Sequence, residues 1–299
     1  MNFDLIREVS MAEKIVGVIG GSGLYEMEGL EGIQSVSLKT PFGDPSDSFI
    51  TGHLDGLKIV FLPRHGKGHR IAPSFLNYRA NIYGMKKLGA DWIIGVNAVG
   101  SMKESIHPGH MVIPDQLIDR TVARPSTFFS EGIVGHVSFA DPFCPVLGQV
   151  LYEAGKEAGA TVQKNGTYLC MEGPQFSTRA ESNLYRSWGV DIIGMTNLPE
   201  AKLAREAEIC YATIAFATDY DCWHHEAADV SIGDVLRILA QSAKTAKATI
   251  RRAVQMLPDQ RTCVCSRALE HALITDRTLI PEKTIKHLEP IIGKYIRSD

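Results

Sequence analysis

Short apolar segments alternate with segments of helical periodicity along most of this chain, and this alternation restricts the fold more than any other feature. Apolar runs of strand length occupy residues 14–19, 33–38, 49–54, 57–62, 91–100, 111–118, 161–171, 190–195 and 209–217. Helical spacing of apolar residues covers 73–88, 146–158, 178–188, 198–207, 231–257 and 284–295. Buried strands that alternate with helices predict an α/β fold with a central mixed β-sheet flanked by helices.

No internal repeat or low-complexity linker divides the 299 residues, so we predict one domain. Residues 1–13 are interpreted as an N-terminal extension, with Met11 as a candidate natural start. Residues 14–258 form the main domain. Residues 259–299 are predicted to be a C-terminal tail whose terminal helix packs on that domain.

The charge balance excludes some function classes. The chain has 31 basic and 34 acidic side chains, a net charge of −3, and no basic block interleaved with aromatic residues. A nucleic-acid partner is therefore not expected. No apolar run approaches the roughly 20 residues that span a bilayer, and the N-terminal segment lacks a signal peptide's apolar region. We expect a cytoplasmic protein with no membrane partner.

The six cysteines fall into two groups. Four lie in apolar or motif contexts and are predicted to be reduced, packed thiols. Cys263 and Cys265, in "RTCVCS", are separated by one residue. That spacing is tight for a zinc knuckle, and no second pair completes four ligands, so no metal is predicted. Two incidental thiols and a disulfide or redox pair both remain open.

The ends of the predicted strands are the candidate ligand site, because ligands of open α/β sheets bind beyond the carboxyl ends of the strands. These ends are polar or rich in glycine: "GGSG", "PRHGKGH", "NAVGS", "MEGPQFS", "GMTN" and "TDYD". The loop around Ser22 has backbone amides that suit an anion. A dinucleotide fingerprint is disfavoured because the spacing of G-x-G-x-x-G is absent.

Two of these strand ends carry residue types that bind phosphate and sugar. Arg64 and His65 follow an apolar strand, and guanidinium binds phosphate oxygens in a bidentate manner; Ser22 and Thr196 are candidate hydroxyl donors. Glu172 suits a sugar diol, and Phe176 suits a ring face. A solvated basic turn and a surface carboxylate are the structural alternatives.

Asp219 and Asp221 follow the last predicted strand and flank one tyrosine. Burial of a carboxylate without a partner is costly or raises its pKa. Either both side chains are solvated, or a donor-rich ligand lies between them.

Several motifs together resemble the trimeric purine nucleoside phosphorylase family, in its methylthioadenosine branch. They are "GVIGGSGLY", "TPFGDPSD", "RHGKGH", "NYRANIYGMKKLG", "ARPSTFF", "DPFCP", "EGPQFSTRAES" and "GMTNLPEAKLAREAEICYATIAFATDYDCW". The similarity covers residues 14–257. It implies a homotrimer or a pair of stacked trimers, a purine nucleoside and inorganic phosphate as co-substrates, and neither cofactor nor metal.

The resemblance also implies roles for individual residues. Those implied for phosphate are Ser22, Arg64, His65, Asn97, Ala98 and Thr196, although some relatives have threonine where this chain has Asn97. Met195 and Phe176 would line the ribose. His136 would surround the 5' substituent with Ile232 and Val235, His136 coming from a neighbouring subunit.

Asp219 and Asp221 would face the base. A protonated Asp219 suits N7 as a general acid, and one carboxylate of the pair suits the exocyclic amino group as an acceptor. The expected reaction converts methylthioadenosine and phosphate into adenine and 5-methylthioribose 1-phosphate. Adenosine remains a possible second substrate, because an apolar slot discriminates against an added hydroxyl by only about 10².

Two alternatives remain. A 6-oxopurine nucleoside or methylthioinosine phosphorylase would need a donor rather than two carboxylates at the base. A non-catalytic nucleotide-binding module would need the glycine loop and base-binding residues, but it gives no reason for Arg64, His65 and Thr196.

Overall fold

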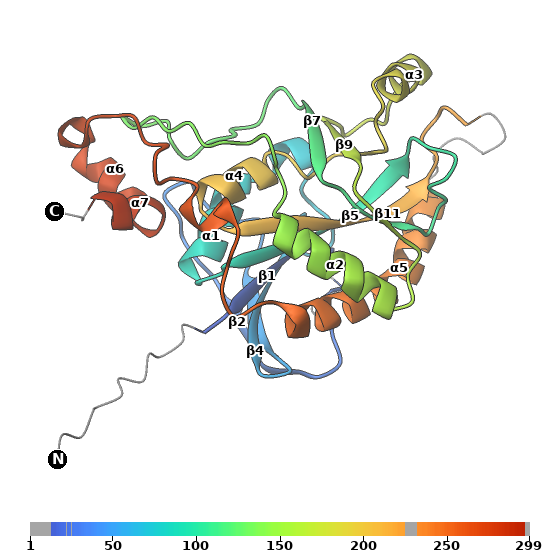
Figure 1. Cartoon of the computed structure of the whole chain (residues 1–299), viewed down its shortest axis with the longest axis horizontal. Helices are drawn as coiled ribbons and strands as arrows, with labels where there is room; N and C mark the ends of the chain where they lie inside the picture. Colours follow the sequence, from blue (N-terminus) through green and yellow to red (C-terminus); the bar gives the residue numbers. More distant parts are fainter. Residues whose placement is uncertain (1–12, 22, 25, 225–231, 297–299) are drawn as a thin grey trace.

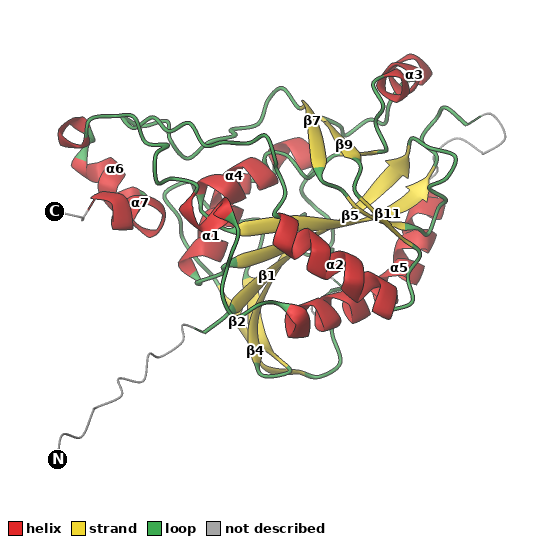
Figure 2. Cartoon of the chain, viewed as in Figure 1, coloured by secondary structure: helices red, strands yellow, loops and turns green. Residues whose placement is uncertain are grey.

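The computed structural model describes residues 13–21, 23–24, 26–224 and 232–296. Its central feature is a mixed sheet of 11 strands with helices on both faces (Figures 1 and 2). The strands are β1 (Ile15–Gly20), β2 (Leu30–Val36), β3 (Phe49–Leu54), β4 (Leu57–Pro63), β5 (Trp92–Ser101), β6 (Met111–Ile113), β7 (Gln116–Arg120), β8 (Val162–Lys164), β9 (Thr167–Met171), β10 (Ile192–Gly194) and β11 (Cys210–Asp219). The predicted fold class is confirmed.

The helices lie between the strands in the order that the sequence predicts. They are α1 (Tyr78–Lys87), α2 (Pro145–Glu157), α3 (Arg179–Ser187), α4 (Glu200–Glu206), α5 (Ile232–Met256), α6 (Glu282–His287) and α7 (Glu289–Ile296). Three short 3-10 helices, η1 (Pro73–Phe75), η2 (Val264–Arg267) and η3 (Arg277–Leu279), complete the described elements.

Parallel pairing places several strand ends at one edge of the sheet. Strand β1 pairs in parallel with β4 and β5, and β5 pairs in parallel with β11. The amide of Arg64, just after β4, donates to the carbonyl of Gly20 at the end of β1, at 2.9 Å. The ends of β1, β4 and β11 therefore open on the same side, as the sequence analysis assumes.

Strand β1 shows how the apolar pattern builds two cores. Ile15 and Ile19 belong to a cluster that also contains residues of α1, α4 and α7, whereas Val16 and Val18 belong to a cluster with α2 and α5. Successive side chains of a strand point to opposite faces. A continuous apolar run is thus what a strand covered on both faces requires.

Some predicted elements are divided in the structure. The expected strand 111–118 is interrupted at Pro114, which has no N–H for a ladder hydrogen bond. The expected strand 161–171 is interrupted by Asn165 and Gly166, whose φ angles of 67° and 142° form a turn. Helix α1 begins at Tyr78 rather than at 73, because the Asn77 side chain caps it by accepting from the amide of Ala80.

The tail leaves α5 and crosses to the opposite face of the sheet, where α7 lies near α1 (Figure 1). The hydroxyl of Tyr83 in α1 donates to the carbonyl of His287, and Tyr295 bonds through its hydroxyl to Glu208. The predicted terminal helix is two helices, and Pro290 lies in the first turn of the second, where its missing N–H is not needed. Among the described residues, no helix is long and apolar enough to cross a membrane.

Candidate active site

Arg64 lies at the end of β4 with its side chain only 3% exposed. Its Nε and Nη2 donate to the two carboxylate oxygens of Glu200, each at 2.9 Å, and its other bonds reach the carbonyls of Val96 and Ile19. Four of its five N–H groups are engaged by protein, so one Nη1–H stays available to a ligand. The pKa of Arg64 is raised by Glu200 against the opposing effect of burial.

A buried polar network continues from this ion pair. The hydroxyl of Tyr211 donates towards Glu200 at 2.8 Å and Asn197 at 2.6 Å. Asn97 accepts from the Thr196 hydroxyl at 2.6 Å and donates to Thr213 and Asn197. The Asn97 side chain is engaged by protein partners, so within this network it orients Thr196.

His65 is half-buried beside Arg64 and stacks on His69 with ring centroids 4.1 Å apart. Its Nδ1 lies 2.8 Å from the carbonyl of Ile71, which can only accept, so Nδ1 carries a proton. Burial, together with the nearby charge of Arg64, lowers the pKa of His65 to about 4. The ring is therefore neutral at pH 7, and Nε2 presents a lone pair unless an anion draws a proton onto it.

Asp219 and Asp221 form a locked pair at the end of β11. The amide of Asp221 donates to Asp219 Oδ1 at 2.8 Å, and the Thr218 hydroxyl donates to Oδ2 at 2.7 Å. Burial raises the pKa of both carboxyls, and the charge of Asp219 raises the pKa of Asp221 further. Asp221 is only 5% exposed, so the alternative in which both side chains are solvated is wrong.

Gly100 on β5, which has no side chain, leaves room for the side chains of Asp219 and Asp221. An added Cβ there would lie 3.0 Å from Asp219 Oδ1 and 3.4 Å from Asp221 Cβ. Asp221 also has a φ of 53°, which holds its side chain over the same glycine rather than along the strand.

Glu172, at the end of β9, binds protein groups in this structure. Its Oε2 accepts from the amides of Val122 and Ala123, and its Oε1 accepts from Arg124 Nε at 3.1 Å. Burial raises the pKa of Glu172, but the Ser74 side chain, the Val122 amide and Arg124 together outweigh burial and lower it to about 2. Arg124 donates in turn to the carbonyl of Met195, so Glu172 and Met195 are joined through one guanidinium.

The remaining predicted site residues lie in different places. Ala98 is half-buried on β5, and Phe176 is 44% exposed. His136 lines a separate cleft of about 710 Å³, together with residues of α2 and the tail. Ser22 and the side chains of Ile232 and Val235 lie outside the described residues.

Cys263 and Cys265 lie in and beside η2, away from the strand ends, and both are free thiols. Cys263 Sγ is 3.2 Å from Cys210 Sγ and 3.6 Å from Cys144 Sγ. The two cysteines of the tail thus belong to a larger group that the sequence analysis did not assemble.

The residues whose hydrogen bonds position the site side chains are not apparent from the sequence. The main ones are Glu200, Tyr211 and Arg124. Glu200 is the informative omission, because its side chain is 0% exposed in a helix that a pattern of apolar spacing alone describes as amphipathic. Its position in "NLPEAK" directly after the strand end "GMTN" was the available signal.

Comparison with known proteins extends the geometry. A family model described as the phosphorylase superfamily matches residues 15–255. The curated S-methyl-5'-thioadenosine phosphorylase of Geobacter sulfurreducens is 62% identical over 285 residues, covering 95% of this chain and 100% of that protein.

Solved structures agree with this similarity. A methylthioadenosine phosphorylase from an Antarctic soil metagenomic library superposes with a TM-score of 0.89 at 47% identity, over 93% of this chain and 99% of that one. The methylthioadenosine phosphorylase of Schistosoma mansoni in complex with adenine gives a TM-score of 0.79 at 35% identity, over 86% and 96%. Another structure names the Schistosoma protein an adenosine/methylthioadenosine phosphorylase.

Proposed function

The chain belongs to the phosphorylase superfamily, and from this premise we propose that it cleaves S-methyl-5'-thioadenosine with inorganic phosphate to give adenine and 5-methylthioribose 1-phosphate. It is a pentosyltransferase of purine and methionine salvage. Inorganic phosphate is a co-substrate, and the proposal includes no cofactor.

The pair of buried carboxyls at the end of β11 is the observation that carries this proposal. Burial raises the pKa of Asp219 and so favours its protonated form, which is the form that a general acid must have. Asp221, held 2.8 Å away through its amide, adds a carboxyl oxygen that suits the exocyclic amino group of adenine. Two carboxyls suit a 6-aminopurine better than a 6-oxopurine, whose carbonyl oxygen needs a donor.

The chemical step uses both ends of the site. A phosphate oxygen attacks C1' of the ribose as the C1'–N9 bond breaks, and the bonding electrons of that bond pass to the purine. Asp219 gives its proton to N7, so adenine leaves neutral, and the aspartate is reprotonated from solvent. Phosphate, bound near Arg64 and the Thr196 hydroxyl, stabilises the cationic character that develops on the ribose.

Arg64 is suited to hold phosphate because Glu200 and two backbone carbonyls fix its guanidinium before the ligand arrives. Such preorganisation reduces the cost of ordering the side chain on binding. We further propose that phosphate draws a proton onto His65 Nε2, since Nδ1 is committed to the carbonyl of Ile71.

We propose that the protein works as a homotrimer or a dimer of trimers in the cytoplasm. Phe75, Val122 and Phe176 are exposed apolar side chains, and exposed apolar patches mark contact surfaces. His136 lies in a cleft apart from the strand ends, in keeping with its delivery to the 5' substituent of a neighbouring subunit's substrate. Sedimentation or light scattering would distinguish a monomer from either assembly.

The first test compares the phosphate-dependent cleavage of methylthioadenosine, adenosine, methylthioinosine and inosine. We expect adenine release from methylthioadenosine, slower release from adenosine, and no turnover of the two 6-oxopurine nucleosides. Turnover of inosine or methylthioinosine at comparable kcat/KM would overturn the roles of Asp219 and Asp221 in base choice. Failure to cleave all four would favour the non-catalytic alternative.

A further inference from the structure

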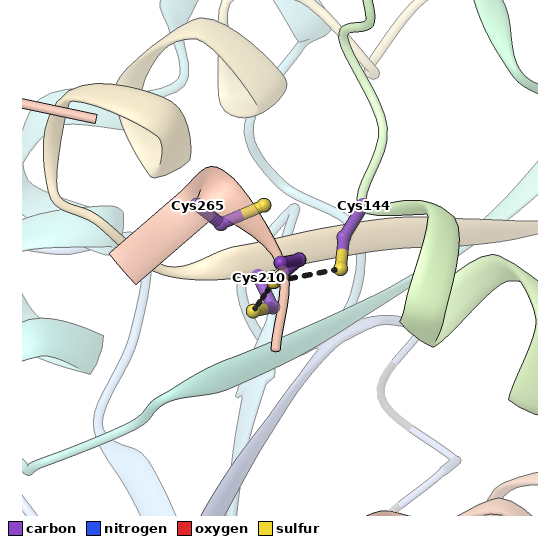
Figure 3. Close-up of side chains that lie close together, drawn as sticks. Cys144, Cys210 and Cys265 are labelled. Carbon is purple, nitrogen blue, oxygen red and sulfur yellow. Dashed lines mark hydrogen bonds between the residues drawn. The ribbon is translucent and has the colours of Figure 1, made fainter. Parts of the chain in front are cut away.

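Four cysteines from three distant segments bring their sulfur atoms together inside the protein. Cys144 caps α2, Cys210 begins β11, and Cys263 and Cys265 flank the start of η2 in the tail. All four are buried, and their Sγ atoms all lie within 4.8 Å of one another. Figure 3 shows the side chains of Cys144, Cys210 and Cys265 converging from their three separate segments.

The separations suit a tetrahedral metal ion better than a cross-link. Four thiolates at a Zn–S distance of about 2.3 Å have sulfur atoms about 3.8 Å apart. The distance is 3.2 Å for Cys210–Cys263 and 3.6 Å for Cys144–Cys263, and none of the pairs exceeds 4.8 Å. A disulfide joins two sulfur atoms at about 2.05 Å, shorter than both of these distances, and all four cysteines are free thiols in this structure.

We propose that Cys144, Cys210, Cys263 and Cys265 bind one structural Zn²⁺ ion. Each thiol loses its proton to solvent when the metal binds, so four protons are released and the site carries two net negative charges. No electron is transferred. The argument against a metal in the sequence analysis was the lack of a second cysteine pair, and the fold supplies that pair from the start of α2 and the start of β11.

The backbone at the start of α2 gives the Cys144 sulfur a hydrogen-bond donor. Its Sγ accepts from the amide of Leu147 at 3.5 Å, as the N-cap of a helix of 13 residues. Backbone N–H groups and the positive end of the helix dipole stabilise negative charge at this position. Amide donors to sulfur of this kind orient and tune metal-bound cysteines.

The cluster also has a route to solvent. Cys144 forms part of the wall of the cleft of about 710 Å³, alongside Arg205 and Arg267. The cleft therefore brings solvent close to the cluster at Cys144.

The position of the cluster predicts what the ion does for the fold. It would tie the tail to both α2 and the sheet. Seven residues after Cys265 the tail reaches Ala272, whose carbonyl accepts from the amide of His136 at 2.9 Å. The ion would thus fix the segment that positions the His136 loop.

The metal content of the purified full-length protein tests the proposal directly. We expect about one zinc per chain by plasma mass spectrometry, and close to none in the variants Cys265→Ala and Cys210→Ala. Cys170→Ala is the matched control, because Cys170 is equally buried but lies outside the cluster, and it should keep its zinc. An unchanged zinc content in Cys265→Ala would overturn the site.

Cobalt substitution tests the site in the unmodified protein, so the result does not depend on whether a cysteine variant folds. Exchange of the metal for Co²⁺ in the unmodified protein should produce the thiolate-to-cobalt charge-transfer band and the strong visible bands of tetrahedral coordination. Four freely alkylated thiols after equilibration with zinc would overturn the proposal. A protein mass lower by two hydrogens for each disulfide, in protein that contains no metal, would also overturn it. These outcomes are separate from the nucleoside assay, so either proposal can fail alone.

Discussion

The two parts of the candidate active site, the Arg64 region and the Asp219–Asp221 region, differ in how buried charge is stabilised. At one end Arg64 and Glu200, with side chains 3% and 0% exposed, form a two-point ion pair. At the other end Asp219 and Asp221 are also largely buried. Burial shifts the pKa values of both carboxyls most, and the other contributions come from neighbouring hydroxyls, backbone amides and the charge of Asp219. Among the described residues, neither aspartate has a cationic partner.

The difference separates a fixed charge from a movable proton. A guanidinium locked against a carboxylate stays charged at all accessible pH values and can hold an anion in one place. A carboxyl whose pKa is raised by burial keeps its proton to a higher pH than a free carboxyl does, and it can still transfer that proton. The proposed function thus assigns the two requirements of phosphorolysis, an anion site and an acid, to different strands of one edge.

The largest expected effect comes from removing the movable proton. Asp219→Asn keeps the shape and the acceptor for the amide of Asp221, but its amide N–H can only hydrogen-bond to N7 and cannot transfer a proton to it. We expect kcat/KM for methylthioadenosine to fall by about 10²–10⁴, measured as phosphate-dependent adenine release. Asp221→Asn should mainly change the preference between 6-amino and 6-oxo bases. Activity of Asp219→Asn within threefold of the parent would mean that this end carries no acid.

Removing the anionic partner of Arg64 should lower the stability of the fold. Glu200→Gln leaves Arg64 buried without its anionic partner, and loss of one member of a buried pair costs about 3–5 kcal/mol in the free energy of unfolding. Lys202→Gln is the control on the same helix, because its pair with Asp119 is about 30% exposed and worth under about 1 kcal/mol. Chemical denaturation measures both. Equal losses would show that Arg64 and Glu200 are not the buried pair described.

The smallest expected effect is on the pH dependence of stability, which should have opposite signs for Glu172 and Asp219. The pKa of Glu172 is lowered from 4.5 to about 2, so its contribution to stability is present above pH 4.5 and lost as the pH falls towards 2. Glu172→Gln should therefore lower stability at pH 7 by about 1–3 kcal/mol, with the difference from the parent disappearing near pH 2.

Asp219 should behave oppositely. Its raised pKa means that stability is greatest where it is protonated and is lost as the pH rises through the folded-state pKa. Asp219→Asn should therefore raise the melting temperature at pH 8 although it removes activity. A lower melting temperature for this variant would indicate that Asp219 is stabilised as a carboxylate, contrary to the comparison.

Local sequence patterns predicted most of the fold. β3 begins and ends where the pattern placed it, and α2 differs by one residue at each end, because apolar periodicity and the nearby Pro, Gly and polar residues act over short distances. The errors lie where one residue interrupts a longer pattern. Pro114 divides one predicted strand, and Asn165 with Gly166 divides another.

The candidate site was predictable where a functional residue ends a strand. Arg64, Thr196 and Asp219 stand out in the sequence because they are polar residues directly after apolar runs. Glu200 and Tyr211 do not, since each lies inside an otherwise ordinary helix or strand. Their partners are 136 and 11 residues away, and only packing reveals that they meet.

The sequence by itself determined the alternation of strands and helices, the polar ends of the strands and the residue types of a phosphate and base site, because these depend on neighbours along the chain. The tertiary structure decided which side chains share a buried space. It engaged Asn97 with Thr196, and it gathered Cys144 and Cys210 around the Cys263–Cys265 pair. Such groupings depend on contacts across 50 to more than 100 residues, which periodicity along the chain does not encode.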